Sequence, residues 1–331
     1  MLFLRWTPKI NTDNSISELS KINVGGIPQW LQIRGTNKDN PVLLFLHGGP
    51  GTAQIGFARK YQSKLENHFV VVNWDQRGSG LSYSSDIDPK TMNIRRFVND
   101  TKEVVNYLLT RFNKEKIFIV GDSWGSLLGI KVINKYPELF HAYVGSGQVV
   151  NMNKNEKLAY EFVFKKAKKR NNKKALQILE SIGSPPYDEL IKSTIYRSKL
   201  TRELGGTMYN DSFFNLFIKK MIFSTEYNIL DIFKFIKGNK FSMINMWEEI
   251  MEVNFFKEVS SFDVPIFFIL GKYDYTAPSE IAQEYYNNID APLKKLIWID
   301  NAAHVMQYEN SNKFQKIIIN KVLNLGTESV V

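Results

Sequence analysis

The pattern that most restricts the fold of this chain is a Gly-x-Ser-x-Gly segment, Gly121-Asp-Ser-Trp-Gly125, which stands between two apolar runs. Residues 116–120 before it are β-branched or aromatic apart from Lys116, which predicts a strand, and residues 127–134 after it have helical spacing. A serine between a strand and a helix occupies a strained turn, where side chains two positions away would collide with the neighbouring strand and helix. The two glycines therefore predict a sharp turn that presents Ser123 as a nucleophile.

The rest of the chain alternates short β-branched and aromatic runs with longer stretches of helical spacing, a pattern typical of an α/β sheet with helices on both faces. The predicted strands are residues 16–24, 29–34, 41–46, 69–74, 116–120, 141–145, 265–270 and 295–299. The first two should form a hairpin at Gly25-Gly26, so the eight-stranded sheet opens antiparallel and continues mostly parallel. Apolar residues at helical spacing predict one long helix over residues 91–112.

Strand signals stop between residues 151 and about 260, where the sequence is aromatic and helical in spacing, with one break at Pro185-Pro186. We therefore expect an α/β core built from residues 1–150 and 261–331, with residues 151–260 inserted as a helical cap. The predicted cap holds 19 Lys and Arg against 13 Asp and Glu, so six of the ten net positive charges fall in this third of the chain.

A net charge of +10 raises the question of a nucleic-acid or acidic membrane partner. The densest basic run, residues 165–170, lies in an amphipathic stretch where it should form the wet face of a helix, and no nucleic-acid-binding module accompanies it. We expect no nucleic-acid partner. No run of about 18 apolar residues occurs, and the start is too short in apolar residues for a signal peptide. The chain as given is predicted to be cytoplasmic, without stable membrane insertion.

The chain has no cysteine, so serine, histidine and carboxylates must supply any catalytic chemistry. A serine hydroxyl needs a base within hydrogen-bond reach. His304 lies in a polar loop after a predicted strand, so it should emerge at the same sheet edge as Ser123. The other histidines are less suited, because two precede predicted strands at the opposite edge and one opens a glycine-rich loop: His68, His141 and His47.

The group that orients the base should lie between the serine and the histidine in chain order, at the end of the penultimate strand. Asp274 ends the segment 265–274, and the 30 residues from there to His304 leave room for one helix and one strand. Asp300 is the alternative, but it shares a loop with His304 and is better suited to shaping that loop. The predicted triad is Ser123, His304 and Asp274, with no metal required.

Residues 47–51, His-Gly-Gly-Pro-Gly, follow a predicted strand in the place of the loop that supplies half of an oxyanion hole. Glycines let backbone N–H groups approach a developing oxyanion, and we assign the two donors to the amides of Gly49 and Trp124. Glycine-rich loops also bind phosphates, but no Lys-Ser/Thr follows this loop and no G-x-G-x-x-G occurs. A nucleotide site is not expected.

Five motifs together, HGGPG at 47–51, WDQRGSG at 74–80, GDSWGS at 121–126, GKYD at 271–274 and AAH at 302–304, resemble those of the proline iminopeptidase family of α/β-hydrolases. The resemblance covers the predicted core and not the cap. It implies an α/β-hydrolase fold and a cofactor-free serine peptidase that releases an N-terminal residue, often proline, from short peptides.

In that family, carboxylates of the helical cap bind the free amine of the substrate. Trp247-Glu248-Glu249 resembles the Trp-Glu element found there, and Glu226 is another candidate. Asp122 and Ala303 depart from the family pattern, in which glycine is common at both positions.

Three functions therefore follow in order of preference. The first is an aminopeptidase for short peptides, and the second is a carboxylesterase or lactonase for small acyl substrates, because fold alone does not decide function. The third is a non-catalytic ligand-binding protein on a hydrolase scaffold, which the intact set of nucleophile, base, acid and oxyanion loop disfavours. A buried acidic pair in the cap would favour the peptide, and an all-apolar cap would favour the ester.

Overall fold

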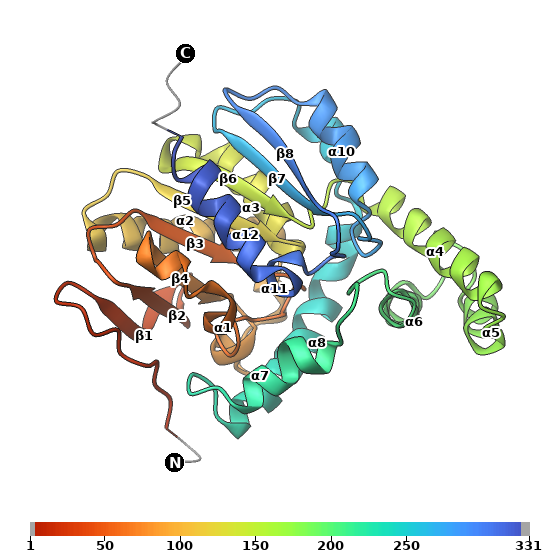
Figure 1. Cartoon of the computed structure of the whole chain (residues 1–331). Helices are drawn as coiled ribbons and strands as arrows, with labels where there is room; N and C mark the ends of the chain where they lie inside the picture. Colours follow the sequence, from red (N-terminus) through yellow and green to blue (C-terminus); the bar gives the residue numbers. More distant parts are fainter. Residues whose placement is uncertain (1–3, 326–331) are drawn as a thin grey trace.

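A computed structural model describes residues 4–325, and its body is one twisted sheet with helices on both faces (Figure 1). The strands are β1 (Ile16–Val24), β2 (Ile27–Gly35), β3 (Val42–Leu46), β4 (Val70–Asp75), β5 (Ile117–Asp122), β6 (Phe140–Ser146), β7 (Ile266–Gly271) and β8 (Lys294–Ile299). They lie in the order β1-β2-β4-β3-β5-β6-β7-β8. Pairs β1–β2 and β2–β4 are antiparallel and the other pairs are parallel. All eight predicted strands are confirmed within two residues at each end.

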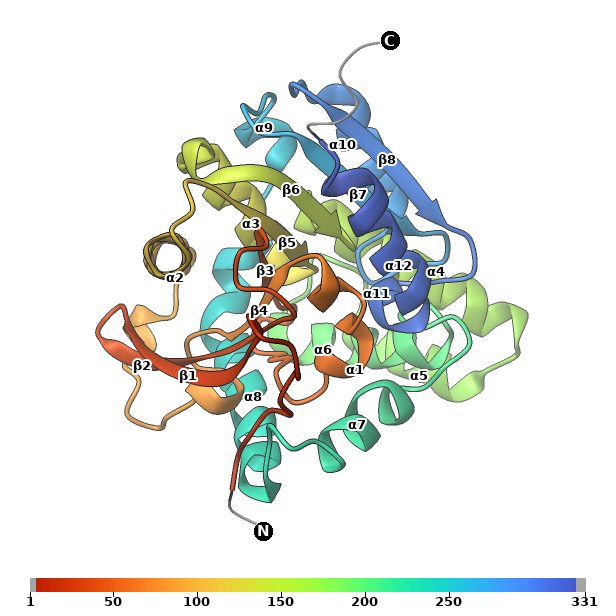
Figure 2. The same cartoon turned by 60° about the vertical axis from the view of Figure 1, so that its left-hand side comes forward.

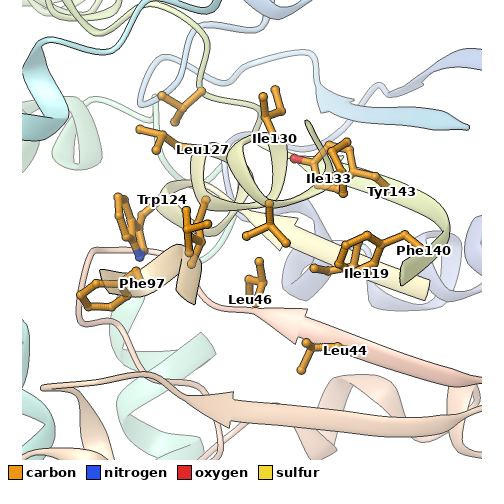
Figure 3. Close-up of a cluster of buried hydrophobic side chains, with 14 of the residues drawn as sticks. Leu44, Leu46, Phe97, Ile119, Trp124, Leu127, Ile130, Ile133, Phe140 and Tyr143 are labelled. Atoms are coloured by element: carbon orange, nitrogen blue, oxygen red, sulfur yellow. The ribbon is translucent and has the colours of Figure 1, made fainter. Parts of the chain in front are cut away.

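Both faces of the sheet are apolar because alternate residues of its central strands point to opposite sides. Leu44 and Leu46 of β3 lie in one core with α2 (Ile94–Phe112) and α3 (Trp124–Lys135), as Figure 3 shows. Leu43 and Phe45 of the same strand lie in the other core, under α12 (Ser311–Ile317). The central strands are therefore continuous apolar runs in the sequence. Packing on both faces holds the edge of the sheet in place.

The predicted long helix is α2, which begins at Ile94, three residues later than expected. The side chain of Asn93 accepts a hydrogen bond from the backbone N–H of Arg96, which caps the first turn and fixes the start of the helix there. Residues 89–91 form a separate 3-10 turn before it.

Residues 151–260, which we call the cap segment, lie between β6 and β7 and contain only helices among their regular elements. These are α4 (Met152–Lys169), α5 (Lys173–Ile182), α6 (Leu190–Glu203), a π-helical turn (Phe214–Ile218), α7 (Lys219–Ile222), α8 (Ile229–Met251) and α9 (Phe255–Glu258). An isolated antiparallel bridge between Asn151 and Asn254 joins the two ends of the segment. Figures 1 and 2 both place α4 to α8 together, beside the sheet.

Three short helices complete the core: α1 (Arg59–Gln62), α10 (Ser279–Asn288) and α11 (Met306–Glu309). Within residues 4–325, no helix has the length and apolar character needed to cross a membrane.

Candidate active site

Ser123 occupies the turn between β5 and α3 with a left-handed backbone conformation, φ 53° and ψ −117°. A Cβ atom at Gly121 would overlap the carbonyl oxygen of Gly125, and one at Gly125 would overlap the carbonyl oxygen of Leu46 on β3. Both glycines are therefore required by close backbone approach, as predicted. The backbone N–H of Ser123 donates to the carbonyl of Ser146, 3.0 Å away, which fastens the turn to the end of β6.

His304 and Asp274 form a buried pair at the same edge of the sheet. His304 Nδ1 donates to Asp274 Oδ2 at 2.8 Å. The other carboxylate oxygen of Asp274 accepts the backbone N–H groups of Thr276 and Ala277, each at 2.9 Å. Asp300, the alternative acid, is exposed and faces Lys272 instead. The histidine is thus oriented by Asp274, whose own position is fixed by two backbone donors.

The turn at Ser123 and the ring of His304 both lie against the end of β6. A Cβ atom at Gly147 would lie 2.8 Å from Cε1 of His304, and the neighbouring Ser146 carbonyl accepts the N–H of Ser123. In the part of the chain that the structure describes, the Ser123 hydroxyl makes no hydrogen bond to His304. Serine–histidine contacts in unliganded hydrolases are often long and tighten when substrate binds.

A second carboxyl group, that of Asp122, directly precedes Ser123 in the chain. Burial raises the pKa of Asp122 to about 7, against the opposing influence of His304 and Gln307. Burial lowers the pKa of His304, but the charge and hydrogen bond of Asp274, with the charge of Asp122, outweigh it and leave that pKa above its usual value. Asp122 Oδ1 is buried without a hydrogen-bond partner among residues 4–325. The departure from the family pattern at position 122 thus places an extra acid next to the histidine.

The glycine-rich loop after β3 stands beside Ser123 and forms part of the same cavity wall, as Trp124 does. Neither the Gly49 nor the Trp124 N–H makes a hydrogen bond among the described residues. Gly49 has φ 117°, and a Cβ atom there would lie 2.6 Å from the amide nitrogens of Gly51 and Thr52. The loop therefore needs glycine at 49, and Gly49 and Trp124, whose amides make no hydrogen bond among the described residues, line the same cavity as Ser123.

Gln76 links this loop to the start of α3. Its backbone N–H donates to His47 Nε2 at 3.1 Å and its side-chain amide donates to the His47 carbonyl at 3.2 Å, while its Oε1 accepts the indole N–H of Trp124 at 2.9 Å. Burial lowers the pKa of His47 to about 4, so this histidine is a neutral hydrogen-bonding group. Arg77 forms a buried ion pair with Asp100 at 2.8 Å and has a structural role.

A cavity of about 930 Å³ opens above Ser123, between the sheet edge and helices α4, α6 and α8. This volume suits a ligand the size of a short peptide. Its apolar wall includes Leu127, Val149, Met152, Ile191, Met243, Trp247 and Ile250. Its basic residues are Lys192, Arg197, Lys199, Arg202 and Lys240. Among the described residues around the cavity, Glu156 is the sole carboxylate.

Glu156 of α4 and Arg197 of α6 form a buried two-point ion pair in the cavity wall, with Arg197 Nε donating to Glu156 Oε2 at 3.0 Å. Sequence reasoning missed this pair. The signal available was the helical spacing of Glu156 with Met152, Ala159 and Val163, which places a carboxylate on an otherwise apolar helix face.

The three carboxylates expected to bind an amine lie away from this cavity. Glu226 is buried and pairs with Arg59 at 2.6 Å, and although burial acts to raise the pKa of Glu226, that partner lowers it below its usual value. Glu249 accepts the backbone N–H of Ile94 at 2.8 Å and so caps α2, and Glu248 is exposed. None of the three lines the cavity above Ser123, so an amine-binding role for Glu226, Glu248 or Glu249 stays a prediction.

Comparison with known proteins shows the family to which this fold belongs. Residues 41–311 match the family described as alpha/beta hydrolase fold. The chain is 38% identical to the probable aminopeptidase YbaC of Bacillus subtilis, over 91% of this chain and 94% of that protein. It is 28% identical to the proline iminopeptidase of Elizabethkingia meningoseptica, over 54% of this chain and 59% of that one. The crystal structure of the proline iminopeptidase-related protein TTHA1809 from Thermus thermophilus superimposes with a TM-score of 0.63 at 17% identity, covering 92% and 98% of the two chains.

The eight-stranded sheet, the turn at Ser123 and the family match all indicate an α/β-hydrolase fold. The chain belongs to the α/β-hydrolase fold family and, as its motifs indicate, is similar to aminopeptidases and proline iminopeptidases within it.

Proposed function

We propose that this hydrolase is a serine aminopeptidase that releases an N-terminal residue, proline or another apolar residue, from short peptides. The observation that carries the proposal is the buried Asp274–His304 hydrogen bond, 2.8 Å long, next to the strained turn at Ser123. The similarity to a probable aminopeptidase over 91% of the chain supports the peptide class.

In the proposed mechanism, the Ser123 hydroxyl attacks the acyl carbonyl while Nε2 of His304 accepts its proton. Asp274 accepts the Nδ1–H of His304, so the Nε2 atom of His304 is left to accept the serine proton. The carboxylate of Asp274 then stabilises the imidazolium that forms. The amides of Gly49 and Trp124 stabilise the oxyanion, at about 3 kcal/mol for each donor. His304 then gives the proton to the leaving amine, and a water molecule activated by the same histidine hydrolyses the acyl-enzyme.

Glu156 is the proposed anchor for the free amine of the substrate, in place of the three carboxylates first expected. It is buried in the cavity wall, and a carboxylate has enough lone pairs to accept an ammonium as well as the guanidinium of Arg197. An amine held there would limit cleavage to the first peptide bond, because only the N-terminal residue carries a free amine. A blocked amine loses this charge-assisted contact.

Replacement of Glu156 by glutamine tests this assignment. With aminoacyl amides, kcat/KM is expected to fall about tenfold to a hundredfold, mainly through KM, since one charge-assisted hydrogen bond to the amine is lost. The N-acetylated amides and short-chain esters should be cleaved at the wild-type rate. Steady-state kinetics on the three substrate sets measures the difference.

The control must account for Arg197, which the single variant leaves as an unpaired buried charge. A second variant, Glu156→Gln with Arg197→Gln, removes both charges, and thermal melting reports whether each variant is folded. The amine assignment fails if a folded variant of either kind keeps the wild-type preference for free over blocked amines.

One feature of the cavity favours the second candidate, hydrolysis of small esters or lactones. The cavity wall is largely apolar, and Arg197 already neutralises the charge of Glu156. The wall therefore contains no acidic pair, although it is not fully apolar. Cleavage of esters together with equal treatment of free and blocked amides would support this candidate.

The pH dependence of kcat/KM should report on Asp122. His304 accepts a proton only when it is neutral, so activity falls as the pH drops through its raised pKa. Asp122→Asn removes a negative charge that raises this pKa, and the acid side of the profile should move to lower pH by roughly half to one unit. In the wild type the acid limb belongs to the interacting pair, because burial raises the pKa of Asp122 to about 7 and its charge acts on His304.

Asp300→Asn is the matched control, since it removes the same charge from an exposed position on the loop that leads to His304. Its profile should overlay that of the wild type. An unchanged acid limb in Asp122→Asn would show that this carboxyl does not influence the base.

A further inference from the structure

One side of α8 carries an exposed, largely apolar stripe, most of which lies outside the cavity of the proposed chemistry. The stripe consists of Ile229, Phe233, Ile236, Lys240 and Ile244. Its four apolar members are 48%, 58%, 57% and 49% exposed, and their spacing places them along one side of the helix. Phe235, Ser242 and Met246 on the other side are buried. The inner face of α8 is therefore packed, while its outer face presents large apolar side chains to solvent.

The stripe widens at the start of α8, where neighbouring segments add exposed side chains. Ile222 and Phe223 at the end of α7 are 51% and 70% exposed, and Trp6 is 54% exposed. The backbone N–H of Trp6 donates to the Thr225 carbonyl at 3.0 Å, which holds this residue beside the turn between the two helices. Figures 1 and 2 place the N-terminal segment, α7 and the start of α8 at the same end of the molecule. So many large exposed apolar side chains at one end of a protein indicate an interaction site.

The exposed charged residues within residues 212–247 are of one sign. Between residues 212 and 247 the basic residues are Lys219, Lys220, Lys234, Lys237 and Lys240. The two carboxylates of the same stretch, Glu226 and Asp231, are buried and paired with Arg59 at 2.6 Å and Arg5 at 2.7 Å. A partner of this surface must therefore accept apolar side chains and supply negative charge.

A second copy of the chain does not meet this requirement. In a twofold dimer the same patch faces itself, which would bring lysines toward lysines without any exposed carboxylate of the patch to pair with them. An anionic bilayer does meet it, because aromatic and aliphatic side chains can enter the boundary between headgroups and acyl chains while lysines contact the phosphates.

We propose that the stripe on α8, with Ile222, Phe223 and Trp6, docks this protein on the surface of an anionic membrane. Lys240 and Ile244 at the inner end of the stripe also line the cavity above Ser123. Docking would bring the cavity mouth close to the lipid surface without any segment crossing the bilayer. Docking of this kind needs only the exposed apolar side chains and the lysines and does not require peptidase activity.

Co-sedimentation with vesicles tests the proposal. The full chain is mixed with vesicles of phosphatidylcholine alone or of phosphatidylcholine and phosphatidylglycerol in equal parts. The wild type should pellet with the anionic vesicles and stay in solution with the neutral ones, and added salt should weaken binding because it screens the lysines. Phe233→Ser with Ile236→Ser should weaken binding about tenfold or more, since two side chains that enter the bilayer boundary are lost.

Phe164→Ser is the matched control, because Phe164 is also exposed and stands near lysines, but on α4 and outside the stripe. It should bind vesicles as the wild type does, and melting curves should show that all variants are folded. The proposal is overturned if the wild type does not pellet with anionic vesicles, or if the double variant pellets equally well. Wild-type dimers in sedimentation equilibrium that the double variant dissociates, without vesicle binding, would assign the surface to a second copy instead.

Discussion

Replacement of Ser123 by alanine should reduce hydrolysis of every substrate of this protein by a factor on the order of a million. The residue is the nucleophile of the proposed mechanism, and its hydroxyl is the one side-chain oxygen placed on the strained turn between β5 and α3. Alanine fits the same backbone, so the fold should be retained. The measurement is hydrolysis of aminoacyl amides, blocked amides and short-chain esters, with circular dichroism to confirm folding.

Ser181→Ala makes the same chemical change at an exposed position on α5 and should leave the rates unaltered. Activity of Ser123→Ala within tenfold of the wild type would mean that another group is the nucleophile. A wild-type protein that cleaves nothing on this panel would favour the non-catalytic ligand-binding alternative.

The second large effect is expected for Asp274→Asn, at about a ten-thousand-fold loss in kcat. The structure explains why the isosteric change should be so damaging. One oxygen of Asp274 accepts two backbone N–H groups, from Thr276 and Ala277, and only an oxygen can take that place. The amide NH2 of asparagine must therefore face His304 Nδ1, which forces the proton onto Nε2 and removes the acceptor for the serine proton.

Asp300→Asn again serves as the comparison, because it tests the alternative acid with the same substitution. It should retain wild-type kcat, while Asp274→Asn should keep a melting temperature close to that of the wild type. If instead Asp300→Asn is the inactive variant, the histidine is oriented by Asp300 in the working enzyme and the pairing with Asp274 is not the catalytic one.

The sheet and the serine turn could be predicted because their determinants are local. Each strand is a short run of β-branched and aromatic residues, and close backbone approach at Gly121 and Gly125 leaves a readable pattern around Ser123. The positions of Asp274 and His304 follow from the chain order of the fold, because each comes directly after a strand that ends at the same edge.

The cavity could not be predicted in the same way, because it depends on how α4, α6 and α8 rotate against one another. Glu226 illustrates the difficulty. Its partner Arg59 is 167 residues away, so nothing in the local sequence shows that the carboxylate is buried in an ion pair and lies outside the cavity lining. Glu156 had a local signal in its helical spacing, but its partner Arg197 lies on another helix and appears only in the folded chain.

The bridge between Asn151 and Asn254 has a consequence for how such enzymes diversify. Because the two ends of the cap segment leave the sheet at adjacent points, β6 and β7 can pair in the same register whatever chain connects them. The connecting helices can then lengthen, shorten or be exchanged between relatives while the strands beneath keep their alignment. Substrate choice and bond-breaking chemistry can in this way be inherited as separate modules of one polypeptide.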